Sequence, residues 1–318
     1  MTHLTTKHLG TVLAAAAALG AIGAAPAPAR AQQAAQRIDT TFAFEKNGWV
    51  DVTIISGTIV ITGWTRPEAR LTARAENGLV QPSISAGRIG LSVRPDFSSR
   101  TGRNRLGPVT VEISVPIGTR VMATAVSGDV RVRGTAAEVQ ANTTSGDIEV
   151  VDANDRVVIQ NTSGDIRLEK IRGRTRVGIT SGDIVLDDIT GSLEINSVSS
   201  DMRIRHVDVT DLRIGTTSGD ITYDGIVDPK GTYEITTHSG DVRFELPENA
   251  GAVLSLQTYS GDIGSSFPMT LMPGQDLRRS RGRRMEFTVG NGGARVAITT
   301  FSGDITIARG PARTPREE

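Results

Sequence analysis

Aspartates are the residues with the clearest chemical potential in this sequence, because one of them follows Ser-Gly at regular intervals along most of the chain. Regularly spaced carboxylates could hold Ca²⁺, which takes about six to eight oxygen ligands, or could supply the acid and base of a glycosidase. They could also simply turn the chain, since Gly adopts unusual dihedral angles and Ser and Asp side chains bond to nearby backbone groups. The triplets are Ser127-Gly128-Asp129, Ser145-Gly146-Asp147, Ser163-Gly164-Asp165, Ser181-Gly182-Asp183, the variant Ser199-Ser200-Asp201, Ser218-Gly219-Asp220, Ser239-Gly240-Asp241, Ser260-Gly261-Asp262 and Ser302-Gly303-Asp304.

The spacing of the triplets favours a structural role in turns. Successive triplets begin 18, 18, 18, 18, 19, 21, 21 and 42 residues apart, and an alternating apolar run follows most of them, as in Ile166 and Leu168. Short runs with period two indicate half-buried strands. One such unit cannot bury its apolar face alone, but copies stacked about 4.8 Å apart share a continuous core. We therefore predict a single-domain, all-β solenoid with coils of about 18–21 residues. A Greek-key sandwich, the competing all-β fold, would not need constant spacing.

Both ends of the repeat carry altered copies. Thr53–Trp64 matches the unit with Thr58 in place of aspartate, and Ser83–Val93 is read as another degenerate copy. Met285–Val289 and Ala294–Thr299 flank a Gly-Asn-Gly-Gly segment, which predicts a carboxy-terminal hairpin that caps the stack. The predicted organisation is a signal peptide at residues 1–31, a linker at 32–41, degenerate coils at 42–120, the regular solenoid at 121–308 and a disordered tail at 309–318.

The first residues are typical of a secretory signal peptide. Lys7 and His8 precede an apolar run that ends near Ala25, and Ala29-Arg30-Ala31 resembles a cleavage site. The run is shorter than the roughly 20 residues of a membrane-spanning helix, so no transmembrane span is expected after cleavage; an uncleaved anchor is the alternative.

The bulk composition narrows the possible functions. The chain has no cysteine, which excludes disulfides, thiolate metal sites and cysteine catalysis. It has 35 basic and 35 acidic residues, so charge gives no reason to expect binding to nucleic acid or anionic lipid.

The segments TTSGDIEV, TSGDIRL and TSGDIVL, placed behind such a leader, resemble an exported bacterial β-strand-repeat family of adhesin-like proteins. That family is formally a domain of unknown function with SGD-I repeats, and the resemblance covers roughly residues 40–308. It implies a β-solenoid outside the cytoplasm. It brings no catalytic residues, because the family has none established.

We therefore predict a non-enzymatic, exported scaffold or adhesin-like module of the bacterial cell envelope, in the periplasm or at the cell surface. It would present its side-chain ladders to an envelope protein or a glycan, with no cofactor, metal or catalytic residue assigned. The contact candidates come from two Arg-rich loops and from the position before the triplet, where threonine gives way to rings: Arg103, Arg105, His238, Tyr259, Arg281 and Phe301.

Two other functions stay open at this point. A carbohydrate-active β-helix enzyme would need a carboxylate pair set apart from the repeat, and no coil carries one in the sequence. A calcium-stabilised surface module would need a second acidic column opposite the triplets, but Asp152, Asp155 and Asp187 fall at differing positions.

Overall fold

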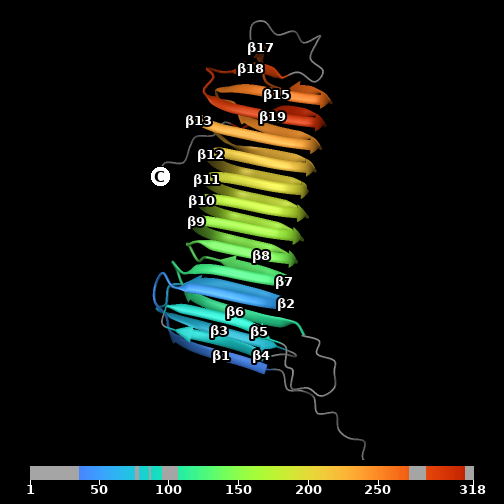
Figure 1. Cartoon of the computed structure of the whole chain (residues 1–318). Coiled ribbons are helices and arrows are strands. Elements are labelled where there is room, and N and C mark those ends of the chain that lie inside the picture. Colours follow the sequence, from blue (N-terminus) through green and yellow to red (C-terminus); the bar gives the residue numbers. More distant parts are fainter. Residues whose placement is uncertain (1–35, 76–78, 86, 95–106, 272–283, 312–318) are drawn as a thin grey trace, which may run out of the picture. The chain divides into compact units, whose positions relative to one another are not determined.

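The computed structural model describes residues 36–75, 79–85, 87–94, 107–271 and 284–311 of the 318-residue chain (Figure 1). The predicted signal peptide and the Arg-rich loops with Arg103, Arg105 and Arg281 lie outside the described residues. The described residues belong to one compact unit, Ala34–Glu318. No helix in this described part is long and apolar enough to cross a membrane.

All elements of the described unit are strands that join in one twenty-stranded sheet. Each triplet except the first lies at a corner where one strand ends and the next begins, and the first, at Ser127, lies within β7. The strands are β1 (Gln36–Ala43), β2 (Trp49–Trp64), β3 (Glu68–Ala75), β4 (Leu79–Ser85), β5 (Arg88–Arg94), β6 (Val109–Pro116), β7 (Arg120–Arg133), β8 (Val139–Ser145), β9 (Ile148–Ser163), β10 (Ile166–Ser181), β11 (Ile184–Ser199), β12 (Met202–Ser218), β13 (Ile221–Ser239), β14 (Val242–Pro247), β15 (Ala252–Ser260), β16 (Ile263–Ser265), β17 (Thr270–Leu271), β18 (Met285–Val289), β19 (Ala294–Ser302) and β20 (Ile305–Gly310).

The regular middle of the unit confirms the predicted solenoid. Consecutive strands β9 to β13 pair in parallel, and each of them makes one coil, so that Ile166 lies beside Ile184 and Ser181 beside Ser199. The 18-residue spacing is thus one turn of the stack. The same register places Ser56 beside Ser127 and Thr58 beside Asp129, which confirms the altered copy at Thr53–Trp64.

The coils at both ends are stacked out of sequence order. Strand β2 lies between β7 on one side and the β5–β6 coil on the other. In the same way, β19 lies between β13 and β15, and β20 lies between β14 and β16. The last triplet, at Ser302, therefore stands between the corners at Ser239 and Ser260, although its sequence position is beyond both.

Antiparallel strands close the two ends and correct three sequence predictions. Ser83–Val93 is not a coil, because β4 and β5 pair antiparallel as a hairpin. Strands β18 and β19 do not form the predicted hairpin, since β15 lies between them; the cap consists of β17, β18 and β15. Strand β1 occupies most of the segment predicted as a linker, because it pairs with β3. These strands cover sheet edges that would otherwise expose unpaired backbone groups.

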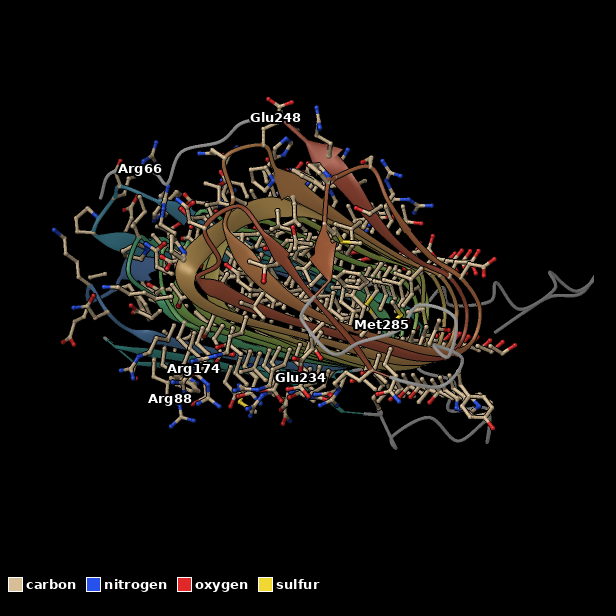
Figure 2. The ribbon with its side chains drawn as sticks, turned by 90° about the horizontal axis from the view of Figure 1, so that it is seen from above. Arg66, Arg88, Arg174, Glu234, Glu248 and Met285 are labelled. Carbon is tan, nitrogen blue, oxygen red and sulfur yellow. The ribbon has the colours of Figure 1, made fainter. Side chains whose placement is uncertain are left out.

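The space enclosed by the coils is filled by apolar side chains, whereas charged residues such as Arg174 and Glu234 point outward (Figure 2). Toward the carboxy-terminal end the core contains three fully buried rings, Tyr223, Tyr233 and Phe244. The rings of Tyr223 and Phe244 stack with centroids 4.6 Å apart. The Tyr233 hydroxyl donates to the carbonyl oxygen of Val209 at 2.8 Å, and burial raises the pKa of this phenol.

Candidate functional site

The corner aspartates form a hydrogen-bonded ladder along the stack. The backbone N–H of Asp165 donates to Oδ1 of Asp147 at 2.9 Å, and that of Asp183 donates to Oδ1 of Asp165 at 3.0 Å. The ladder follows the spatial order of the coils, since Asp304 donates to Asp241 at 2.8 Å and Asp262 donates to Asp304 at 2.9 Å. One carboxylate oxygen in each of these coils is thus engaged by the next corner. Each of these bonds joins the corner of one coil to the corner of the neighbouring coil.

One link differs at the variant corner. No hydrogen bond from the Asp201 N–H to Asp183 is found within the described part of the chain. Ser200, which replaces the usual glycine, is buried, and its hydroxyl lies 2.7 Å from the hydroxyl of Ser197. The side chain at this corner therefore forms a local hydroxyl pair where the other corners have glycine.

The ladder gives Asp165→Ala a predictable cost. We expect the loss of the acceptor for the Asp183 N–H to lower the free energy of unfolding by about 1 kcal/mol. Asp183→Ala is the matched control, because this side chain accepts no such bond and should cost less. Urea denaturation of both variants measures the difference. Equal losses would mean that the carboxylates act through the local turn and not through the coil-to-coil bond.

The described part of the ladder does not bring enough ligands together to bind a metal ion. Each coil contributes a single corner carboxylate, and among the described residues no group of three or more His, Cys, Asp or Glu could hold a metal ion. Arginines lie beside some corners, such as Arg131, whose guanidinium is 3.0 Å from Asp129. This ion pair is partly exposed, and such pairs reduce the repulsion between stacked carboxylates.

A second type of corner was missed in the sequence. Asp152, Lys170, Asp188 and His206 occupy equivalent places in four successive coils and adopt positive φ between 54° and 60°. Asp tolerates this conformation better than most side chains, but Lys gives no such signal. His206 also pairs with Asp187, at 2.6 Å between Nδ1 and Oδ1, and both residues belong to this corner. We assign these residues to turning the chain.

Three predicted contact residues form a stack of rings on the surface. The rings of His238 and Phe301 lie 4.8 Å apart and 7° from parallel, and those of Phe301 and Tyr259 lie 5.0 Å apart and 4° from parallel. All three side chains are exposed. Phe301 stands in the middle because its coil is inserted between the other two. Both faces of Phe301 are therefore covered by neighbouring rings.

The ring stack continues a longer feature that we call the uncharged strip. It consists of two ranks of outward residues, aligned by the strand register and ordered as the coils are stacked. Rank A is Thr53, Thr124, Asn142, Gln160, Gly178, Asn196, Gly215, Thr236, Thr299 and Gln257; rank B is Ile55, Val126, Thr144, Thr162, Thr180, Val198, Thr217, His238, Phe301 and Tyr259.

None of these described residues is Asp, Glu, Lys or Arg, although 22% of the chain is charged. The neighbouring outward rank differs, because it contains Arg176, Glu194 and Arg213. There the guanidinium of Arg176 lies 2.7 Å from Glu194 and lowers the pKa of that carboxyl. The lack of charge is thus a property of the strip and not of the whole surface.

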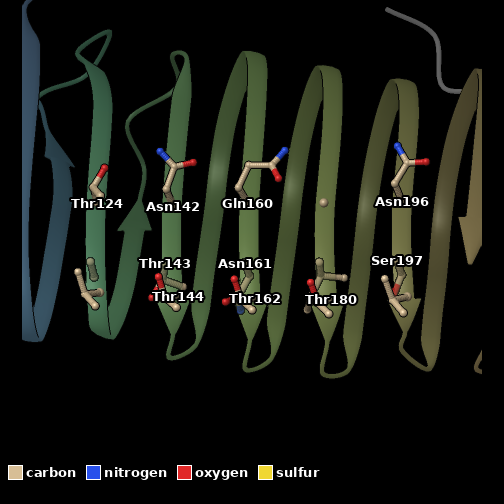
Figure 3. A pocket seen from close by; sticks show the side chains of 15 residues that line it. Thr124, Asn142, Thr143, Thr144, Gln160, Asn161, Thr162, Thr180, Asn196 and Ser197 are labelled. Atoms are coloured by element: carbon tan, nitrogen blue, oxygen red, sulfur yellow. The ribbon is translucent and has the colours of Figure 1, made fainter.

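A trough runs along the strip between the two ranks (Figure 3). It has a volume of about 530 Å³ and is lined by residues of five successive coils, from Thr124–Val126 to Asn196–Val198. Inward-pointing residues form its floor. Asn161 is one of them, and its Nδ2 donates to the carbonyl oxygens of Gly146 and Gly164 at 3.1 and 3.0 Å. The sequence indicated the threonines of rank B, but the trough needs both ranks and was missed.

The repeat region matches a known protein family, and most of the chain aligns with several solved structures. The family model described as Toastrack DUF4097 matches residues 71–190 and 155–308. Among solved structures, a "putative adhesin" from Bacteroides fragilis is 12% identical, with 86% of this chain and 97% of that chain covered and a TM-score of 0.38. A "putative lipid binding protein" from Parabacteroides distasonis is 8% identical, with 86% and 96% covered and a TM-score of 0.41. No curated protein gives a significant match.

Proposed function

The chain belongs to the Toastrack DUF4097 family, and from this premise we propose that it is a non-enzymatic, exported, adhesin-like scaffold of the bacterial cell envelope. The uncharged strip is the surface that it displays to an envelope protein or a glycan, in the periplasm or at the cell surface. The signal-peptide pattern at residues 1–31 supports export.

The observation that carries this proposal is the exclusion of charge from two adjacent ranks over so many coils. Outward positions of a solenoid are free to hold charged residues, which favour solubility. A long, regular surface of hydroxyl, amide and apolar groups is instead suited to contact with a partner, because it can be desolvated without burying an ion. The corner aspartates support a non-catalytic role, since the same backbone bond engages them in coil after coil.

A double variant tests the strip. We expect Thr162→Glu combined with Thr217→Glu to reduce binding of the fluorescently labelled protein to isolated envelopes by at least about tenfold, because a carboxylate buried without a partner costs more than 1.4 kcal/mol. The matched control is Thr222→Glu, which introduces the same change at an outward position of β13 away from the strip. Circular dichroism melting checks that the variants fold alike. Equal envelope binding by the double variant and the wild type would refute the proposal.

A further inference from the structure

We propose that the trough of the uncharged strip binds a neutral, unbranched, β-linked polysaccharide whose chain lies along the stack of coils. This inference rests on the proposed function and names the class of partner. It is drawn from the direction, the repeat distance and the chemistry of the trough.

The direction of the trough sets the direction of the ligand. Its lining residues come from five coils, so its long axis crosses the strands and follows the stack (Figure 3). A compact ligand would use only part of this length. An extended polymer can contact all five coils.

The repeat distance selects the type of polymer. Equivalent groups recur along the trough once per coil, or about every 4.8 Å. An extended β-1,4-linked hexose chain advances by nearly this distance with each sugar, so each sugar falls beside one coil. Alternate sugars are turned by about half a revolution, so every second coil meets a sugar in the same orientation. An extended polypeptide advances only about 3.3 Å per residue and would lose this register within a few residues.

The two walls provide the groups that bind sugar hydroxyls. One wall contains the amides of Asn142, Gln160 and Asn196, which both donate and accept hydrogen bonds, and the other contains the hydroxyls of Thr144 and Thr162. At each end of the trough an exposed valine of rank B, Val126 and Val198, can contact the apolar C–H surface of a sugar ring.

The amide wall also extends over the coil in which the rank A residue is a glycine, Gly178. A Cβ added at Gly178 would lie 2.6 Å from Oε1 of Gln160, so the Gln160 amide covers this glycine. Asn196 covers Gly215 in the same way, because a Cβ added at Gly215 would lie 3.4 Å from Oδ1 of Asn196. Neither glycine has a positive φ, so their role here is to make room for the amides.

The trough fits a neutral chain and not an acidic one. Its lining residues include no cation that could pair with a uronate or phosphate group. They include no anion that would lose its hydration and remain unpaired when a neutral chain displaces water. The floor is also fixed in advance by bonds such as that from Asn161 to Gly164, which lowers the entropic cost of binding.

Titration calorimetry with neutral β-1,4-linked gluco-oligosaccharides of two to six sugars, about the length of the five coils, tests the inference. We expect the affinity to rise with each added sugar until the trough is filled and then to level off. Thr162→Glu should weaken binding of the longest oligosaccharide at least about tenfold. Thr222→Glu, which lies outside the strip and outside the trough, should leave it unchanged.

Three outcomes would overturn the inference. The first is the absence of oligosaccharide binding while Thr162→Glu combined with Thr217→Glu still abolishes envelope binding; the proposed function would then stand with a partner of another class. The second is an equal loss of affinity in Thr162→Glu and Thr222→Glu. The third is a concentration-dependent dimer in sedimentation experiments that Thr162→Glu dissociates, because a second copy of the chain would then cover the strip.

Discussion

A chain that ends after Gly293 should lose ordered structure well before its new terminus. The truncation removes β19 and β20, the coil that stands between β13–β14 and β15–β16. We expect amide hydrogens of β15 and β16 to exchange almost as fast as those of an unfolded chain, while those of β9 to β12 stay protected. Hydrogen exchange followed by mass spectrometry resolves the two regions.

The expected effect is large because of what the inserted coil contributes. Ile298, Ile305 and Ile307 are fully buried, and each such side chain contributes about 1.5–3 kcal/mol by burial. Strand β16 pairs only with β20 within the described residues, and β15 would keep only its antiparallel partner β18. Because neighbouring coils of a repeat stabilise one another, losing this coil removes most of the support for the coil beyond it.

Truncation after Pro311 is the control, since it removes only residues beyond the last described strand. This variant should exchange like the complete chain. If the chain ending at Gly293 keeps β15 protected, then β15 has closed directly onto β13. That result would contradict the expectation that the β15–β16 coil depends on the inserted coil for its support.

The sequence predicts the coil but not the order of the coils. Within one coil, the alternation that begins at Ile166 and the corner at Ser163 specify which residues point inward, and the structure confirms both. Between coils, the same Ser-to-Ser register fits any pair, so Ser260 and Ser302 are equally suitable neighbours of Ser239. The shared register therefore leaves the order of the coils open, and only the structure shows that the coil with Ser302 stands between the other two.

The sequence predicted one part of the candidate site, the exposed column, but neither the ring stack nor the trough. The change from Thr217 to His238 and Tyr259 is visible in the sequence and indicated an exposed column. The stacking of Phe301 between the two rings was not predictable, because it follows from the insertion of β19. The trough is formed because Gln160 and Asn196 line one wall and the threonines of rank B line the other. This arrangement becomes visible only when the register of several neighbouring coils is known.

Gly164→Ala should destabilise the protein more than any change to a corner carboxylate. Gly164 has φ of 123°, a region that residues with a Cβ rarely adopt. An added Cβ would also lie 2.3 Å from the carbonyl oxygen of Gly146, which is backbone of the next coil and cannot move aside alone. Strain in φ alone costs about 1–3 kcal/mol, and the overlap adds to it, so we expect a loss of at least about 3 kcal/mol in urea denaturation.

Gly264→Ala is the matched control, because its φ lies outside the positive range and nothing lies within 4 Å of the added Cβ. It should change the free energy of unfolding by less than about 0.5 kcal/mol. Ser200 occupies the glycine position of its own corner without a positive φ, and that corner lacks the hydrogen bond to Asp183. A side chain is thus accepted where the corner has another shape. If Gly164→Ala proved as harmless as the control, the corner would have to change to the Ser200 form, and exchange of the Asp165 and Asp183 amides would then increase.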